Sequence, residues 1–163
     1  NQCSNTFQKK IDQLKNYETT KKKSELNSVA EPELLDRTMS RPNGIALNLK
    51  QDRLYVSNSD KSDPLWKAFN LSKKGKIASN EIFFDAKPLV KPDRVGVPDG
   101  MTVDKEGNVF ASGPGGVHVF SPNGVILGSI LTESKSSNAE IGGDGYLYIT
   151  AHNKVLRIKL KGK

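Results

Sequence analysis

Short apolar segments alternate with turn signals from residue 33 onward, and this pattern predicts an all-β structure. The segments return about every eight to twelve residues, a spacing typical of sandwiches, barrels and propellers. Glycine, proline or asparagine stands between them where a turn needs a positive or a fixed φ. The expected turns lie at residues 73–76, 104–108, 121–124 and 143–145.

The pattern repeats three times, and the repeat narrows the fold class. The three units start at Asn43, Asp99 and Asn138, which are 56 and 39 residues apart. Units of four short strands with a period of roughly 40 to 50 residues are typical of propeller blades. The longer first interval indicates an inserted loop, which we place at residues 87–97. The sequence therefore predicts that residues 30–163 form β-propeller blades.

Residues 1–29 differ from the rest of the chain. They contain no glycine and no proline, and Phe7, Ile11 and Leu14 recur at helical spacing. Three consecutive lysines, residues 21–23, then interrupt any apolar face. We expect a short helix or a flexible tail here, and a helix that docks on a partner is the alternative.

The first position of each unit is polar, and it is the candidate functional site. Inner strands of a propeller converge on a central channel, so Asn43, Asp99 and Asn138 should point toward one place at its mouth. Three oxygen-bearing side chains that meet can coordinate a cation. Asparagine and aspartate before glycine are also common turn residues that bond their own backbone, so a purely structural role stays open. His152 lies at a strand-linking turn and is a further channel-lining candidate.

The cysteine and histidine content limits the kind of metal site. The chain has one cysteine, Cys3, and two histidines, His118 and His152. This content excludes an internal disulfide framework and disfavours a cysteine-based zinc site. His118 alternates with valines, which favours a position on a strand face over a ligand role. Any metal should therefore be held by oxygen atoms, as hard cations are.

The net charge of +7 is densest near the C-terminus, where residues 153–163 hold five Lys or Arg and no acidic residue. Such a strip can bind polyanions. A charged edge strand that discourages aggregation is the alternative. We favour the edge strand and expect no nucleic-acid partner, because no aromatic side chains are interleaved for base stacking.

Five motifs resemble those of a known family, and together they keep the family's order over about residues 34–160. The chain resembles the senescence marker protein, gluconolactonase and luciferin-regenerating enzyme family, specifically its bacterial gluconolactonase-like members. The motifs are SRPNGIAL (40–47), RLYVSNSD (53–60), FFDA (83–86), VPDGMTVDKEGNVFASGPGGVHVFSP (97–122) and LYITA (147–151).

The resemblance implies a six-bladed β-propeller with one divalent cation in its channel. Calcium is the first candidate, and zinc, manganese and magnesium are alternatives. It also implies a metal-dependent hydrolase that opens a sugar lactone or related cyclic ester by metal-polarised attack of water. Asn43 and Asp99 match the family's metal ligands, and Asp99 is also the catalytic candidate. Asn138 and His152 are candidates for lining the channel.

One departure from the family pattern affects these expectations. The family chain is nearly twice as long, and its N-terminal half supplies a glutamate ligand and a substrate-binding arginine that have no counterpart here. We therefore expect the C-terminal three blades of a propeller. Open strand edges and apolar faces favour self-association or pairing with a missing half. A non-catalytic or incomplete module is the alternative function.

Localisation rests on little more than Cys3. It is a candidate lipid-attachment cysteine left from an export signal, which favours the bacterial periplasm or cell envelope, with the cytoplasm as the alternative. No apolar run approaches the ~20 residues that a membrane-spanning helix needs, so we expect no transmembrane segment.

Overall fold

The computed structural model describes residues 32–161, and this part of the chain is all β apart from one short 3₁₀ turn. Contacts divide the chain into two units, Asn1–Leu34 and Leu35–Lys163, and all the strands given below lie in the second. The helix or tail predicted for residues 1–29 and the candidate Cys3 lie outside the described residues. The strands are β1 (Pro42–Leu47), β2 (Arg53–Asn58), β3 (Leu65–Leu71), β4 (Ile77–Asp85), β5 (Met101–Val103), β6 (Val109–Gly113), β7 (Gly116–Phe120), β8 (Ile126–Leu131), β9 (Ser136–Ile141), β10 (Tyr146–Ala151) and β11 (Lys154–Lys159), with η1 at Lys87–Leu89.

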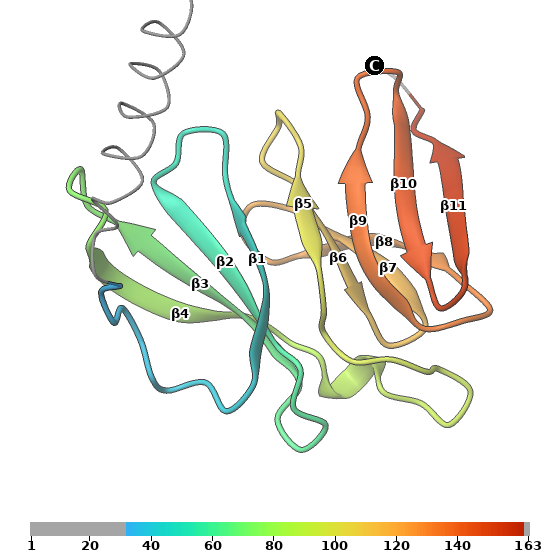
Figure 1. Cartoon of the computed structure of the whole chain (residues 1–163), viewed down its shortest axis with the longest axis horizontal. Helices are drawn as coiled ribbons and strands as arrows, with labels where there is room; N and C mark the ends of the chain where they lie inside the picture. The colour runs from blue at the N-terminus through green and yellow to red at the C-terminus, as the bar shows by residue number, and fades with distance from the viewer. Residues whose placement is uncertain (1–31, 162–163) are drawn as a thin grey trace, which may run out of the picture. The chain divides into compact units, whose positions relative to one another are not determined.

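The strands form three antiparallel sheets, each a simple meander in chain order. Blade 1 has the order β1-β2-β3-β4, blade 2 the order β5-β6-β7-β8, and blade 3 the order β9-β10-β11. The first strands of the blades, β1, β5 and β9, follow one another across the structure (Figure 1). The three repeat units therefore correspond to three blades, and the predicted architecture, part of a β-propeller, is confirmed.

Local sequence explains where the strands end. All four expected turns join consecutive strands of one blade. In the turn from β5 to β6, Gly107 takes φ 87° and the Asp104 carboxylate accepts a hydrogen bond of 2.7 Å from the Asn108 N–H. Only glycine enters that φ region without steric cost, so the turn chemistry sets the register of this hairpin. The predicted insertion contains η1 and the loop that leads to β5.

Aromatic side chains fill the space between blades 1 and 2. Trp66 in β3 and Phe120 in β7 are both fully buried, with ring centroids 5.3 Å apart. Tyr55 and Phe83 pack edge to face at 4.9 Å within blade 1. A separate apolar cluster joins blades 2 and 3 through Phe110, Val117, Ala139, Leu147 and Ile149. These two interfaces fix the angle between neighbouring sheets, and so the relative positions of β1, β5 and β9.

The two ends of this arc of blades differ in character. The outward-facing side of blade 1 exposes Ile45 and Ile82, with 63% and 62% of their surface accessible. At the other end β11 is an edge strand of the described sheet and all six of its residues are exposed. The lysine-rich C-terminal strip thus lies largely on a sheet edge. The expected self-association or pairing with a missing half stays a prediction.

No helix among residues 32–161 is long and apolar enough to cross a membrane.

Candidate functional site

Two of the predicted site residues meet at one end of the inner strands. Asn43 lies in β1, and Asp99 precedes β5 by two residues. The Asn43 Nδ2 donates a hydrogen bond of 2.9 Å to Asp99 Oδ1, across 56 residues of sequence. The same nitrogen donates to Ser59 Oγ at 3.0 Å, and Ser59 Oγ in turn donates to the Pro98 carbonyl. The structure therefore brings Asn43 and Asp99 into direct contact and locks them to the loop before β5.

The glycines that follow these residues allow this close approach. A Cβ at Gly44 would lie 2.2 Å from the Asp99 carbonyl oxygen, and a Cβ at Gly100 would lie 2.2 Å from Asn138 Oδ1. No side chain fits at such distances, so neighbouring inner strands contact each other through glycine backbone. The Asn-Gly and Asp-Gly pairs thus mark contacts between blades rather than ordinary turns.

Asp99 is the half-buried centre of the contact. Its side chain is 13% exposed, and Lys135 Nζ lies 3.4 Å from Oδ2. Its backbone N–H donates to the Ser112 carbonyl at 2.9 Å, and the next residue, Gly100, donates to the Ser137 carbonyl at 2.8 Å. Blade 2 and blade 3 therefore both hold the segment that presents the carboxylate. One carboxylate oxygen accepts from Asn43 and the other lies in ion-pair range of Lys135.

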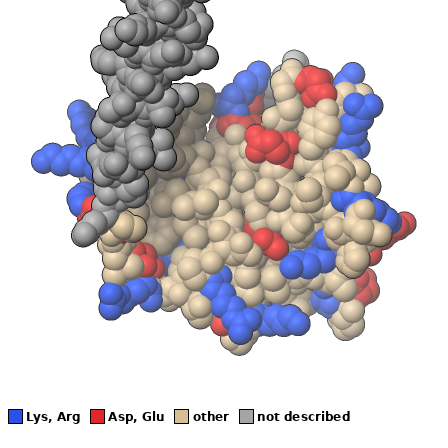
Figure 2. Space-filling model, in the orientation of Figure 1, with Lys and Arg blue, Asp and Glu red and all other residues tan. Residues whose placement is uncertain are grey.

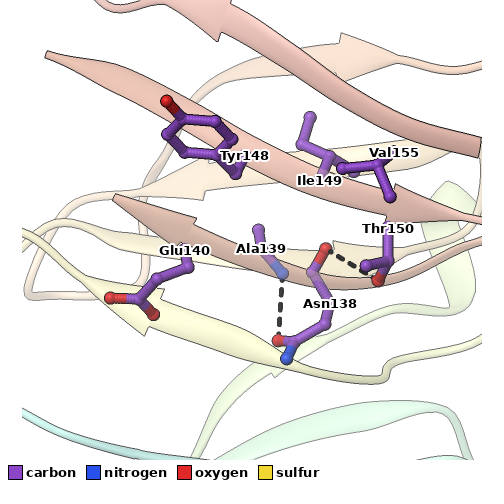
Figure 3. Close-up of a pocket in the computed structure, with 7 residues that line it drawn as sticks. All are labelled: Asn138, Ala139, Glu140, Tyr148, Ile149, Thr150 and Val155. Carbon is purple, nitrogen blue, oxygen red and sulfur yellow. Dashed lines mark hydrogen bonds between the residues drawn. The ribbon is translucent and has the colours of Figure 1, made fainter. Parts of the chain in front are cut away.

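Asn138 lies beside this centre without bonding to it. Its Oδ1 packs against Gly100 but accepts a hydrogen bond of 2.9 Å from the N–H of the next residue, Ala139. Figure 3 shows Asn138 at one side of a pocket on blade 3, with Thr150 next to it on β10 and Tyr148 further along the same strand. The structure places Asn138 at the rim of the Asp99 contact, with its amide carbonyl engaged locally.

The two histidines take different positions. His152 is exposed in the turn between β10 and β11 with φ 53°, and its backbone N–H donates to the Lys135 carbonyl at 3.0 Å. That bond ties the turn to the residue that pairs with Asp99, although no described residue hydrogen-bonds the His152 imidazole. His118 is fully buried, with Nε2 3.0 Å from the Pro114 carbonyl and Nδ1 2.8 Å from Ser129 Oγ. Because a carbonyl only accepts, Nε2 carries the proton and Nδ1 accepts from Ser129.

His118 should make stability depend on pH. Burial lowers the pKa of its imidazole; the Pro114 carbonyl opposes this shift and the positive charge of Arg94 adds to it. As the pH falls below about 6.5, the unfolded chain binds a proton that the native imidazole does not, so stability should fall with pH. We expect His118→Gln to flatten the fall in melting temperature between pH 7.5 and 5.5.

The exposed histidine provides the control for this measurement. His152→Gln should leave the slope of melting temperature against pH as it is in the unchanged chain. If the slope in His118→Gln also equalled that of the unchanged chain, the buried imidazole would not be the group that makes stability depend on pH.

Comparison with known proteins decides the family. Residues 10–153 match the model of the SMP-30/Gluconolactonase/LRE-like region. The chain belongs to this family. A gluconolactonase of Zymomonas mobilis is 38% identical over 133 residues, which are 79% of this chain and 37% of that protein. The match begins at residue 10, inside the predicted tail, whose boundary stays a prediction.

Solved structures support the propeller assignment. A gluconolactonase of Xanthomonas campestris superposes with a TM-score of 0.68 at 28% identity, covering 82% of this chain and 42% of that one. Regucalcin of Agrobacterium tumefaciens, a calcium-binding protein, has a TM-score of 0.59 at 20% identity and supports the fold alone. The superposition covers 74% of this chain and 42% of that regucalcin. The chain spans about a third of the length of the curated relatives it matches.

The candidate metal ligands of this gluconolactonase-family chain are oxygen atoms, which suit a hard cation, but they are fewer than such a cation takes. Asn43 uses its amide nitrogen for both of its side-chain hydrogen bonds, so its Oδ1 stays available among the described contacts. The Asp99 carboxylate adds two more oxygen atoms. Among residues 32–161 no three His, Cys, Asp or Glu side chains gather into a metal-binding group. Oxygen donors suit Ca²⁺, which takes six to eight of them, so this chain holds only part of a complete ligand set.

Two residues of the site were not found from the sequence. Ser59 and Lys135 contact Asn43 and Asp99, yet both lie outside the aligned repeat positions. Ser59 belongs to the RLYVSNSD motif, which indicated the family but did not predict a role for the Ser59 hydroxyl. Lys135 is one of 25 basic residues, and nothing in its local sequence separates it from the others.

Proposed function

We propose that this chain supplies part of the cation-binding channel of a gluconolactonase-type hydrolase, which opens a sugar lactone or a related cyclic ester. The observation that carries the proposal is the contact between Asn43 and Asp99 at the common end of two inner strands. Family membership and the gluconolactonase of Zymomonas mobilis support the choice of reaction.

Asn43 now turns its amide nitrogen toward Asp99, so rotation of that amide would bring Oδ1 beside the Asp99 carboxylate and let the two residues hold one divalent cation. Calcium is our first choice, because the donors are oxygen atoms and because the regucalcin neighbour is a calcium-binding protein. Zinc, manganese and magnesium are alternatives. When bound, such a cation supplies Lewis acidity that polarises a carbonyl. Asn138 and His152 stay candidates for lining the channel.

Asp99 is also our candidate for the catalytic carboxylate, which would accept the proton of the attacking water. The two roles compete, because a carboxylate whose charge is shared with a cation is a weaker base. We therefore propose that Asp99 first holds the cation and that a further carboxylate, from the part of the propeller outside this chain, shares the proton transfer. Pairing with that part would also supply the remaining ligands.

Asp99→Asn tests the proposal. Loss of the carboxylate should lower lactone hydrolysis at least about a hundredfold, the size expected when a charged group at a metal site is removed. The amide oxygen can still accept from Asn43, so the β-sheet circular dichroism spectrum should stay unchanged. Hydrolysis is measured as acid release in a pH-stat.

The matched control is Asp63→Asn, which removes an exposed carboxylate that pairs with Lys87 on the surface. It should leave hydrolysis within about twofold, since exposed ion pairs contribute little. Activity retained in Asp99→Asn would remove Asp99 from the mechanism.

A second candidate function is a non-catalytic propeller module. The observation that favours it is the single carboxylate, Asp99, in direct contact with Asn43, in a chain that spans about a third of its curated relatives. Calorimetric titration with Ca²⁺, Mn²⁺ and Zn²⁺ separates the two candidates. Cation binding that Asp99→Asn abolishes supports the hydrolase channel, and a folded chain that binds none of the three cations supports the module.

A further inference from the structure

Lys135 occupies the side of Asp99 that Asn43 leaves free. We propose that its ammonium group is the resident counter-ion of Asp99 and that a divalent cation must displace it to bind. The inference rests on the proposed function, because it concerns the same carboxylate. It assigns to Lys135 a positioning role that sets the affinity of the site for cations.

The two oxygens of Asp99 face different partners. Oδ1 accepts from Asn43 at 2.9 Å, and Oδ2 lies 3.4 Å from Lys135 Nζ. Asp99 makes no other ion pair among the described residues. A cation that binds both Asn43 and Asp99 therefore encounters a positive charge that is already within ion-pair distance of one of its ligands.

Two contacts position the backbone and the base of the side chain of Lys135. Its carbonyl accepts from the His152 N–H at 3.0 Å, which fixes the backbone immediately before β9. A Cβ at Gly96 would lie 3.6 Å from Lys135 Cγ, so the aliphatic stem passes close to the loop before β5. Two separate segments thus fix where the side chain starts, and from there Nζ reaches to 3.4 Å from Asp99 Oδ2.

The exposure of Lys135 lets a cation displace its ammonium group, and the positive charge of that group opposes binding of the cation. The Asp99 side chain is 13% exposed and the Lys135 side chain is 50% exposed, so the lysine can swing into solvent while the carboxylate stays where it is. Two like charges near one carboxylate repel, and partial burial strengthens that repulsion relative to bulk water. The lysine should therefore lower the affinity of the site for Ca²⁺ without blocking it.

Many Lys and Arg side chains of the visible face lie toward its periphery (Figure 2). Because exposed charges further apart than about 10 Å are largely screened by salt, removing Lys135 should matter more to a cation at Asp99 than removing a distant lysine.

Lys135→Met is the direct test, because methionine keeps an unbranched stem and removes the charge. Calorimetric titration of the whole chain with Ca²⁺ should show affinity about three- to tenfold tighter than in the unchanged chain. Lys154→Met is the matched control. Lys154 is 47% exposed, compared with 50% for Lys135, and it forms an ion pair of 3.1 Å with Glu133 instead of Asp99. Its replacement should leave Ca²⁺ affinity within about twofold, since it removes the same charge from a site that Asp99 does not share.

A second measurement follows the chemical reactivity of the Lys135 side chain. Brief acetylation with an N-hydroxysuccinimide ester, followed by mass spectrometry, gives the relative reactivity of each lysine. Without added metal, Asp99→Asn should raise the acetylation rate of Lys135 about two- to fivefold and leave that of Lys154 unchanged. Adding Ca²⁺ should raise the Lys135 rate in the unchanged chain and have no effect in Asp99→Asn.

The two measurements separate failure of the inference from failure of the proposed function. Suppose that Ca²⁺ binds, but that Lys135→Met leaves its affinity unchanged and that Ca²⁺ leaves the acetylation rate of Lys135 unchanged. The counter-ion role would then be overturned, and the cation site would remain. A rise of Lys135 reactivity in Asp99→Asn, together with no Ca²⁺ binding to the unchanged chain or to Lys135→Met, would overturn both the cation site and the displacement.

Discussion

Trp66→Ala should lower the free energy of unfolding by about 3–5 kcal/mol, the range for removing a large buried aromatic side chain. The indole is fully buried between blades 1 and 2, with ring centroids 5.3 Å from Phe120 and 6.3 Å from both Phe84 and His118. Its loss would leave a cavity at the interface that sets the angle between the two sheets. Urea denaturation followed by circular dichroism measures the change.

Trp66→Phe is the matched control for this change. Phenylalanine keeps an aromatic ring in the same space and removes Nε1, a buried donor without a hydrogen-bond partner among the described residues. Leaving a buried donor unpaired is itself costly, so its removal offsets part of the lost packing. We expect Trp66→Phe to cost about 1 kcal/mol or less. A loss of only about 1 kcal/mol in Trp66→Ala as well would show that the indole is not the main contact between the blades.

Gly44→Ala should both destabilise the chain and disrupt the candidate site. The new Cβ would lie 2.2 Å from the Asp99 carbonyl oxygen and 2.7 Å from Gly100 Cα, and both of these atoms belong to the backbone. Backbone cannot rotate away as a side chain can, so β1 must move off the segment before β5. Overpacking of this kind costs about 1–3 kcal/mol. The same shift should separate Asn43 from Asp99 and weaken Ca²⁺ binding, measured by calorimetry.

Gly128→Ala provides the comparison. Gly128 lies in β8, where an added Cβ meets no atom within 4 Å. The substitution should change the free energy of unfolding by less than about 0.5 kcal/mol and leave cation binding unchanged. If Gly44→Ala were equally harmless, the inner strands would not be in the close contact that the site requires.

The blade repeat could be predicted from sequence because it depends on neighbouring residues. Turn residues such as Gly107 and Gly124 take positive φ, which their side-chain-free backbone allows, and strand segments carry enough apolar residues to form buried faces. Each blade is a meander of consecutive strands, so local signals define almost its entire topology.

The candidate site was only partly predictable, and the difference lies in how its residues come together. Asn43 and Asp99 occupy equivalent repeat positions, so a propeller geometry places them near each other without any knowledge of side-chain packing. Asn138 was predicted at the third equivalent position, and this alignment is wrong by one residue. Ala139 pairs with Ile149 as Met101 pairs with Ala111 and Ile45 with Val56, so Ser137 holds the position of Asn43 and Asp99. Ser59 and Lys135 reach the site from loops, which carry no periodic signal.

The sequence by itself thus determined the strands, the turns, the three blades and the pairing of two polar positions, because periodicity and turn chemistry act over a few residues. Only the tertiary structure decided which groups touch Asp99. The distance from its carboxylate to Lys135 depends on the angle between blades 2 and 3 and on how the Lys135 stem passes the loop at Gly96. Both are set by packing between segments far apart in the chain, which no local pattern records.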